Sequence, residues 1–298
     1  MKGTRGAETV LARGMFAAAR ALPWRASLGV GTQLGDLVHG LGLRRRVASD
    51  NLALAFPEWS AAERARVLRA HYRELGRVAL EYARLGELVH AEPGRVIASF
   101  EGREHLERLI RGGRGAILVS GHFGNFELMG AALGRIHPTD FVVRPLANPG
   151  VETLIARQRT AAGIGEIPSD ASLRRIYERL RANRWVGMLA DQDARRAGVF
   201  VPFLGRPAST AIGPARISLA TGAPIVTGFG WREADGRHRL VIDAPLEIEA
   251  PDAPDAALRL TLAHVRRLEQ RIREHPDQWF WLHRRWKTTP PAGDGKDG

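Results

Sequence analysis

The sequence of 298 residues contains no cysteine and only three lysines. The lack of cysteine excludes disulfide bonds, a thiol nucleophile and a cysteine-ligated zinc site. No apolar run reaches the roughly 18 residues that a membrane-spanning helix requires. Arg13, Arg20 and Arg25 interrupt the stretch where the apolar core of a signal peptide would lie, so we expect none.

The charge is strongly basic, with 44 Lys and Arg residues against 32 Asp and Glu residues and a net charge of +12. Three of the 44 are lysine, so 41 are arginine. Such an excess attracts nucleic acid, anionic membranes or acidic proteins, and does not choose among them. The length and the 44% hydrophobic share are ample for a substantial core, in one large domain or two.

The stretch from residue 115 to 133 predicts a strand, a tight turn and a helix. Residues 115–119 are short, apolar and β-capable, and residues 128–133 have helical spacing. Between them lies Ser-Gly-His-Phe-Gly-Asn-Phe-Glu, residues 120–127, which places His122 at the turn. In an open α/β sheet, ligands and chemistry collect where the carboxyl end of a strand leads into a helix.

Glu127 follows His122 by five residues. With His122 in the turn and Asn125 as the helix cap, Glu127 falls in the first helical turn and can bend back toward the imidazole. The helix dipole favours a carboxylate there. Such a pair acts as base and orienter, because the carboxylate fixes the histidine tautomer and stabilises its protonated form. The structural alternative is a helix start with a polar His and a dipole-satisfying Glu.

Two further strands follow the same pattern. Residues 141–143 end at Arg144, and residues 185–190 end at Asp191, with helices predicted after Asn148 and over about 171–183. This alternation predicts an α/β fold with a mainly parallel sheet flanked by helices. His122, Arg144 and Asp191 each follow a strand, so we expect them on one rim of the sheet.

These residues resemble a known family, the bacterial lipid A late acyltransferases (lauroyl and myristoyl acyltransferases) of the glycerolipid-acyltransferase-like superfamily. The resemblance covers roughly residues 35 to 290. It rests on residues 51–57 (NLALAFP), 121–127 (GHFGNFE), 143–149 (VRPLANP), 157–159 (RQR), 191–193 (DQD), 200–205 (FVPFLG) and 278–287 (QWFWLHRRWK), in the family's order.

The resemblance implies an acyltransferase that moves a fatty acyl chain from acyl carrier protein, or acyl-CoA, to a hydroxyl of a lipid A precursor. His122 is then the general base and Glu127 its orienter. At the positions of Arg159 and Asp191 the family uses an arginine and an acid as functional residues. We expect Arg144, Asn125, Arg157 and Gln192 to bind substrate. We expect no cofactor and no metal site, since Asp191 and Asp193 alone are a weak metal-binding pattern.

Three regions are expected along the chain. Residues 1–95 form a helical, membrane-associating region that mixes apolar residues with arginines. Residues 96–288 form the α/β acyltransferase domain, and residues 289–298 a disordered tail. The resemblance places the protein on the cytoplasmic face of the inner membrane, peripheral or monotopic. Residues 279–287 interleave aromatic and basic side chains that could stack on nucleic acid, bind a membrane interface or pack against the sheet.

Alternative functions remain open at this stage. The same fold could acylate another glycolipid, such as a phosphatidylinositol mannoside, or an aminolipid. A hydrolase could use the same pair on water, with Ser120 nearby, although the chain lacks a Gly-x-Ser-x-Gly elbow. The charge alone would also fit a nucleic-acid-binding protein without catalysis, for which a steep salt dependence of binding is expected.

Overall fold

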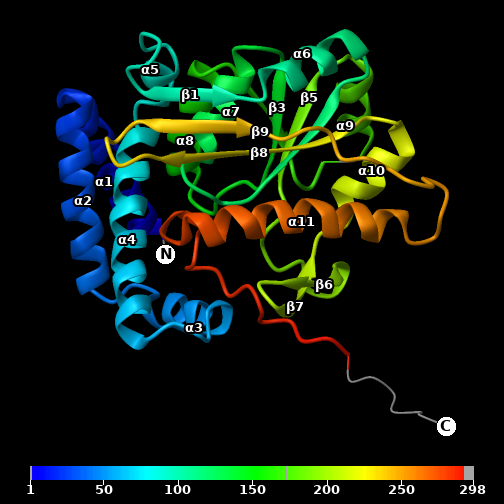
Figure 1. Ribbon diagram of the computed structural model, residues 1–298. Coiled ribbons are helices and arrows are strands. Elements are labelled where there is room, and N and C mark those ends of the chain that lie inside the picture. The colour runs from blue at the N-terminus through cyan, green and yellow to red at the C-terminus, as the bar shows by residue number, and fades with distance from the viewer. Residues whose placement is uncertain (1, 172, 292–298) are drawn as a thin grey trace.

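The computed structural model describes residues 2–171 and 173–291 (Figure 1). The helices are α1 (Lys2–Ala21), α2 (Trp24–Gly40), α3 (Arg45–Ala55), α4 (Ala61–Tyr82), α5 (Leu85–Val89), α6 (Arg103–Gly112), α7 (Phe126–Gly134), α8 (Pro149–Ala161), α9 (Leu173–Arg181), α10 (Gly213–Thr221) and α11 (Ala256–Glu274), with 3-10 turns at Arg195–Ala197 and Pro276–Gln278. Most of the predicted tail, residues 292–298, lies outside the described residues.

The strands form one large sheet and one hairpin. They are β1 (Ile97–Glu101), β2 (Ala116–Ser120), β3 (Thr139–Val143), β4 (Ile164–Pro168), β5 (Trp185–Leu189), β6 (Val199–Phe203), β7 (Arg206–Thr210), β8 (Ile225–Arg232) and β9 (His238–Ile242). The seven-stranded sheet has the order β1-β9-β8-β2-β5-β3-β4. Only the β8–β9 pair in it is antiparallel. The predicted fold class is therefore confirmed.

The central strand β2 is buried because helices cover both faces of the sheet. Its residues Ala116 to Val119 are all apolar and buried, as expected for a parallel strand without a solvent-facing side. In Figure 1, α11 crosses one face of the sheet while α7 and α8 lie behind β8 and β9. Because β2, β5 and β3 run parallel to one another, their carboxyl ends share one rim.

The N-terminal helices pack beside the sheet, with α1, α2 and α4 at one side of the molecule (Figure 1). Helix α4 begins at a capping box, in which Ser60 Oγ accepts from the Glu63 amide and the Glu63 carboxylate accepts from the Ser60 amide. Helix α2 lies close on α4, since a Cβ on Gly31 would come within 2.7 Å of the Arg77 Cα. This contact fixes α4, whose last turns reach the site described next.

Candidate active site

The turn between β2 and α7 carries His122 and is held by a distant segment. The Phe280 amide donates to the His122 carbonyl at 2.9 Å, and the Gly124 amide donates to the Gln278 carbonyl at 2.7 Å. Gly124 has a φ of 52°, and a Cβ there would overlap the Gly230 carbonyl, so only glycine fits. Of the aromatic residues in the 279–287 segment, Trp279 and Trp281 are fully buried and therefore pack in the core beside this turn.

His122 and Asp191 face each other because β2 and β5 are parallel neighbours in which Ser120 pairs with Leu189. Each residue lies two positions beyond that pair. Nδ1 of His122 is 2.8 Å from Oδ1 of Asp191, and the His122 amide donates to Oδ2 at 2.8 Å. The indole N–H of Trp279 donates to the same Oδ2, also at 2.8 Å. The buried carboxylate thus holds the ring in one orientation.

The carboxylate bonded to the imidazole is therefore Asp191 and not Glu127, which corrects the expected pairing. Glu127 is the second residue of α7 and turns toward α8, where Arg159 donates to it from Nε at 3.1 Å and from Nη2 at 2.5 Å. Nη1 of Arg159 donates to Glu166 of β4 at 2.8 Å. Arg159 is thus a clamp between two carboxylates, and all three of its donor nitrogens are engaged.

The protonation of His122 reflects burial and charge together. Burial acts to lower its pKa, but the charge and hydrogen bond of Asp191, together with the charge of Glu127, outweigh burial and raise the pKa. Burial acts to raise the pKa of Asp191, and its bonds to His122 and Trp279 bring it down to about 2. Asp191 is therefore ionised at neutral pH and favours the protonated imidazole. Glu127 acts on His122 through its charge alone.

A cavity of about 630 Å³ adjoins His122 between α7 and the sheet. Its apolar wall consists of Leu118, Val119, Met129, Leu133, Phe141, Val142, Val143, Met188, Leu189 and Ile242. Polar lining residues include His122, Glu127, Arg144, Arg159 and Gln192, and the Gln192 Nε2 lies 3.4 Å from the His122 Nε2. An apolar cavity with a few convergent polar groups is the usual form of a ligand site.

Two predicted substrate-binding residues lie elsewhere. Asn125 caps α7 by accepting from the Leu128 amide at 3.0 Å, as predicted, and its Nδ2 donates to Glu81. Both ends of its side chain are thereby occupied, and it does not line the cavity. Arg157 is exposed on α8, two positions before Arg159, and a two-residue step turns about 200° around a helix. Neither placement favours direct contact with substrate.

A buried ionic network behind the turn has no counterpart in the sequence-based expectations. Glu81 of α4 is fully buried and accepts from Trp24 Nε1 at 3.0 Å, from Asn125 Nδ2 at 2.8 Å and from Arg232 Nη2 at 2.7 Å. His238 Nε2 lies 3.0 Å from it. Burial acts to raise its pKa, and the charges of His238 and Arg232 hold that pKa well below its usual value. The network ties α2, α4, β8 and β9 to the cap of α7.

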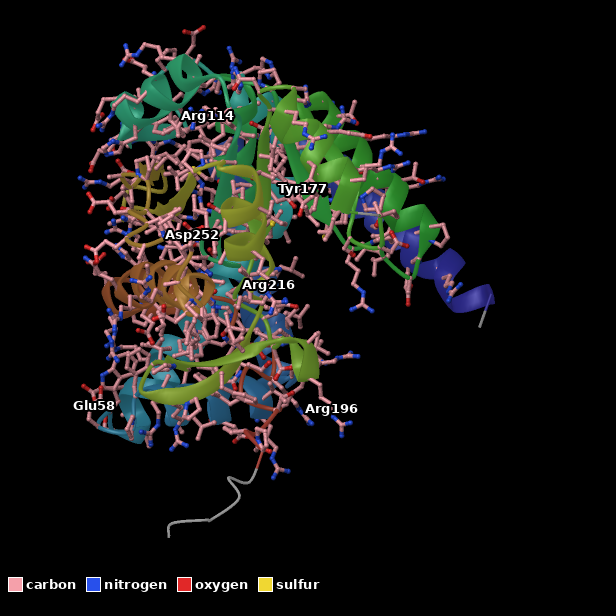
Figure 2. The ribbon with its side chains drawn as sticks, turned by 90° about the vertical axis from the view of Figure 1, so that its right-hand side faces the viewer. Glu58, Arg114, Tyr177, Arg196, Arg216 and Asp252 are labelled. Carbon is pink, nitrogen blue, oxygen red and sulfur yellow. The ribbon has the colours of Figure 1, made fainter. Side chains whose placement is uncertain are left out.

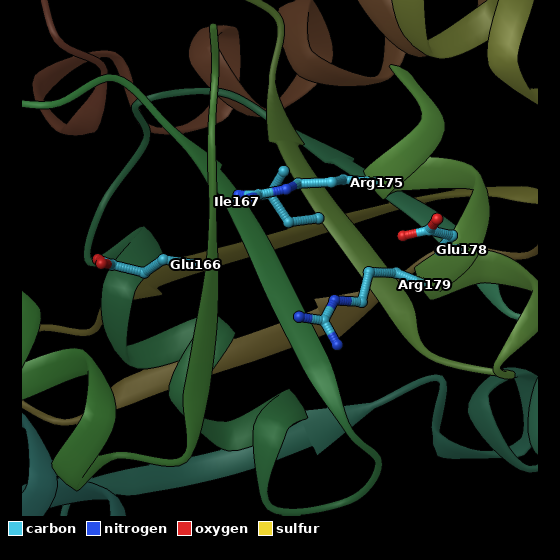
Figure 3. Close-up of a pocket in the computed structure, with 5 residues that line it drawn as sticks. All are labelled: Glu166, Ile167, Arg175, Glu178 and Arg179. Atoms are coloured by element: carbon cyan, nitrogen blue, oxygen red, sulfur yellow. The ribbon is translucent and has the colours of Figure 1, made fainter. Parts of the chain in front are cut away.

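A second hollow of about 380 Å³ lies at the edge of the sheet between β4 and α9 (Figure 3). Its lining residues are Glu166, Ile167, Arg175, Glu178 and Arg179, so it is charged rather than apolar and lacks a histidine. Glu166 links it to Arg159. Among the described residues, no group of three His, Asp or Glu side chains is arranged to hold a metal ion.

The fold and the cavity together define the class of protein. An imidazole bonded to a carboxylate, at an apolar cavity on the carboxyl edge of a parallel sheet, suits an enzyme that acts on a fatty acyl group. The model of the bacterial lipid A biosynthesis acyltransferase family matches residues 3–288, and the chain belongs to this family. It is therefore an acyltransferase. This finding favours an enzyme over the nucleic-acid-binding protein that the charge alone had left open.

Individual relatives agree with the family. The chain is 31% identical over 275 residues to the lipid A biosynthesis palmitoleoyltransferase of Escherichia coli (strain K12), which covers 90% of this chain and 87% of that protein. It is 30% identical over 277 residues to the lipid A biosynthesis lauroyltransferase of the same organism, covering 90% and 88%. It is also 31% identical over 225 residues to a phosphatidylinositol mannoside acyltransferase of Mycobacterium tuberculosis (strain CDC 1551 / Oshkosh), covering 73% and 69%. The chain is thus a lipid A or related glycolipid acyltransferase.

Proposed function

We propose that the protein transfers a fatty acyl chain from acyl carrier protein, or acyl-CoA, to a hydroxyl of a lipid A precursor. The observation that carries this proposal is the position of His122, which meets an apolar cavity on one side and the buried Asp191 carboxylate on the other. The cavity takes the acyl chain, and the acceptor hydroxyl approaches Nε2 of the imidazole. No cofactor takes part in this reaction.

His122 acts as the general base in this scheme. With the proton of Nδ1 donated to Asp191, Nε2 accepts the hydroxyl proton as the oxygen attacks the thioester carbonyl. The tetrahedral intermediate collapses with formation of the C–O ester bond and cleavage of the C–S bond. The imidazolium returns its proton to the departing thiolate, so protons and charge balance without an acyl-enzyme. Asp191 keeps the tautomer and stabilises the imidazolium.

The other polar residues of the cavity support this chemistry. Glu127 and Arg159 form a clamped ion pair that raises the affinity of His122 for its proton through the Glu127 charge. Gln192 offers an amide donor beside Nε2. Arg144 follows β3, is exposed and lines the cavity, so its guanidinium suits a phosphate of the donor or of the acceptor.

The surface fits a membrane-bound acceptor and an acidic donor protein. Among the described residues, no helix is long and apolar enough to cross a membrane. Exposed apolar side chains nevertheless gather on α1, on α2 and just after α2, at Val10, Leu11, Val30, Leu37, Leu41 and Leu43, beside the arginines of residues 1–95. We place membrane attachment there, at the cytoplasmic face of the inner membrane. The exposed Arg196 and Arg216, labelled in Figure 2, share another face and suit an acidic carrier protein.

The acceptor has one serious alternative, because a phosphatidylinositol mannoside acyltransferase is as similar in identity as the palmitoleoyltransferase. The wider coverage of both E. coli lipid A enzymes favours lipid A. A hydrolase is a third candidate, since the same base could activate water. The fate of the acyl chain separates these possibilities.

Mass spectrometry tests this proposal. The purified protein is incubated with acyl carrier protein or CoA carrying an isotope-labelled acyl chain, and with a lipid A precursor or a phosphatidylinositol mannoside in separate vesicles. We expect label on the lipid A precursor. Label on the mannoside alone would replace the acceptor, and label found only as free fatty acid would identify a hydrolase. His122→Ala is the variant without the base, and Asp140→Asn, changed at a buried carboxylate outside the cavity, is the control variant that keeps it.

A further inference from the structure

On the sheet side of the cavity, the deepest layer consists of one residue from each of three neighbouring strands. Leu118 of β2 pairs with Gly187 of β5, which in turn pairs with Phe141 of β3. All three line the cavity, whereas the next inward layer, Ala116, Trp185 and Thr139, does not. The layer of Leu118, Gly187 and Phe141 is therefore the floor of the cavity, two residues or about 7 Å below the strand ends.

Phe141 is the one bulky ring in this floor, and two glycines make room for it. A Cβ on Gly187 would lie 2.6 Å from the Phe141 Cδ1, and a Cβ on Gly130 of α7 would overlap the tip of the same ring. The ring thus spans the space between the sheet and α7. Glycine inside a helix costs about 1 kcal/mol of stability relative to alanine. The Phe141 ring explains the glycine at position 130, because it leaves no room there for a side chain.

One side chain closes each flank of the cavity. On the β9 flank the Ile242 side chain reaches over β8, since a Cβ on Gly228 would lie 2.7 Å from Ile242 Cδ1. On the β3 flank the Phe141 ring reaches over β5 in the same way, and it also meets Gly130 of α7. A chain that enters at His122 and runs toward β3 therefore ends against a ring that spans the space from the sheet to the helix.

We propose that Phe141, held between Gly130 and Gly187, is the residue that limits the length of the acyl chain. This inference rests on the proposed acyl transfer and adds the determinant of chain-length specificity. Phe141 is half-buried, and its layer of the sheet lies four residues before His122 along β2, so it selects the chain without taking part in the chemistry. A chain one methylene too long for the floor must displace the ring or leave the cavity. Each misfit methylene changes kcat/KM by about 10-fold or more.

The experiment compares wild type with Phe141→Leu and Phe141→Ala. Each protein receives acyl carrier proteins loaded with a ladder of saturated acyl chains in competition, together with the acceptor lipid, and the products are weighed. We expect the preferred chain to lengthen from wild type to Leu to Ala, with the ratio of the longer to the original chain rising about 10-fold or more for Phe141→Ala. Phe100→Ala is the matched control, because Phe100 borders the same core cluster but lies outside the cavity.

A second measurement is independent of turnover. Free fatty acids of the same ladder compete for the cavity with a fluorescent fatty acid. The longest fatty acid that still displaces the fluorescent one should be longer for Phe141→Ala than for wild type, and unchanged for Phe100→Ala. Unchanged chain preference and unchanged competition in folded Phe141→Ala would overturn the role of Phe141 while acyl transfer stands. Absence of transfer by wild type would count against the proposed function, and the competition series would then decide on Phe141 alone.

Discussion

Replacement of Asp191 by asparagine should reverse the tautomer of His122. Oδ2 of Asp191 accepts the His122 amide and the Trp279 indole N–H, each at 2.8 Å, so this position must remain an oxygen. The new NH₂ group then occupies the Oδ1 position, 2.8 Å from Nδ1, and makes Nδ1 an acceptor. The ring proton moves to Nε2, which can no longer accept the hydroxyl proton. The same exchange in the serine-protease triad lowers kcat by about 10⁴-fold, and we expect a loss of about 10³–10⁴-fold.

The assay is the rate of labelled acyl transfer as a function of pH. In wild type, kcat/KM should rise with pH as His122 loses its proton, with a midpoint above 6.5 because its pKa is raised. Any residual activity of Asp191→Asn should have its acid limb at lower pH, since the carboxylate that raised the pKa is gone. Asp140→Asn, altered at another buried carboxylate, should keep near-normal activity. Folded Asp191→Asn that retains activity within about tenfold of wild type would refute this reasoning.

Further predictions concern stability. Glu127→Gln breaks a nearly buried ion pair with Arg159 and should lower the free energy of unfolding in urea by about 3 kcal/mol. The double variant Glu127→Gln/Arg159→Gln should lose less stability than the sum of the two single variants, because both changes remove the same ion pair. Additive losses would contradict this coupling. His71 and His264 are buried and neutral, with pKa values lowered by burial from 6.5 to about 4. Between pH 6.5 and about 4 the unfolded chain binds more protons than the folded chain, so the free energy of unfolding should fall as pH drops, by about 3 kcal/mol per histidine. His264→Leu should reduce the slope of unfolding free energy against pH. An unchanged slope would show that His264 does not contribute to it.

Local patterns in the sequence were sufficient for the scaffold of the site. The apolar run of β2, the turn at His122 and the cap at Asn125 are neighbours in the chain, so spacing and capping rules predict them. The strand ends at Arg144 and Asp191 followed from the same rule. Strand β4, with Gly165 and Pro168 among its five residues, carries a weak strand pattern and was not predicted.

The pairings within the site could not be predicted in the same way. Asp191 is 69 residues from His122, and only the register of β2 against β5 brings them together. The spacing of Glu127 favoured a local partner, and the structure directs that carboxylate to Arg159 instead. Glu81 lies in the region predicted only as helical and membrane-associating, and its bond to Asn125 joins segments 44 residues apart. The periodicity of a sequence predicts which side of a helix or strand is buried. It does not predict which distant helix or strand packs against that side.

The central claim, that His122 is the base for acyl transfer to lipid, is tested most directly by His122→Ala. The measurement is the rate of labelled ester formation from acyl carrier protein to the lipid A precursor, with thermal unfolding as the check on folding. Removal of a general base typically lowers a rate by about 10²–10⁴-fold, and we predict a loss in that range for His122→Ala. Any lipid product that the variant still forms should have the same mass as the wild-type product. Folded His122→Ala that forms the labelled lipid at the wild-type rate would contradict the claim.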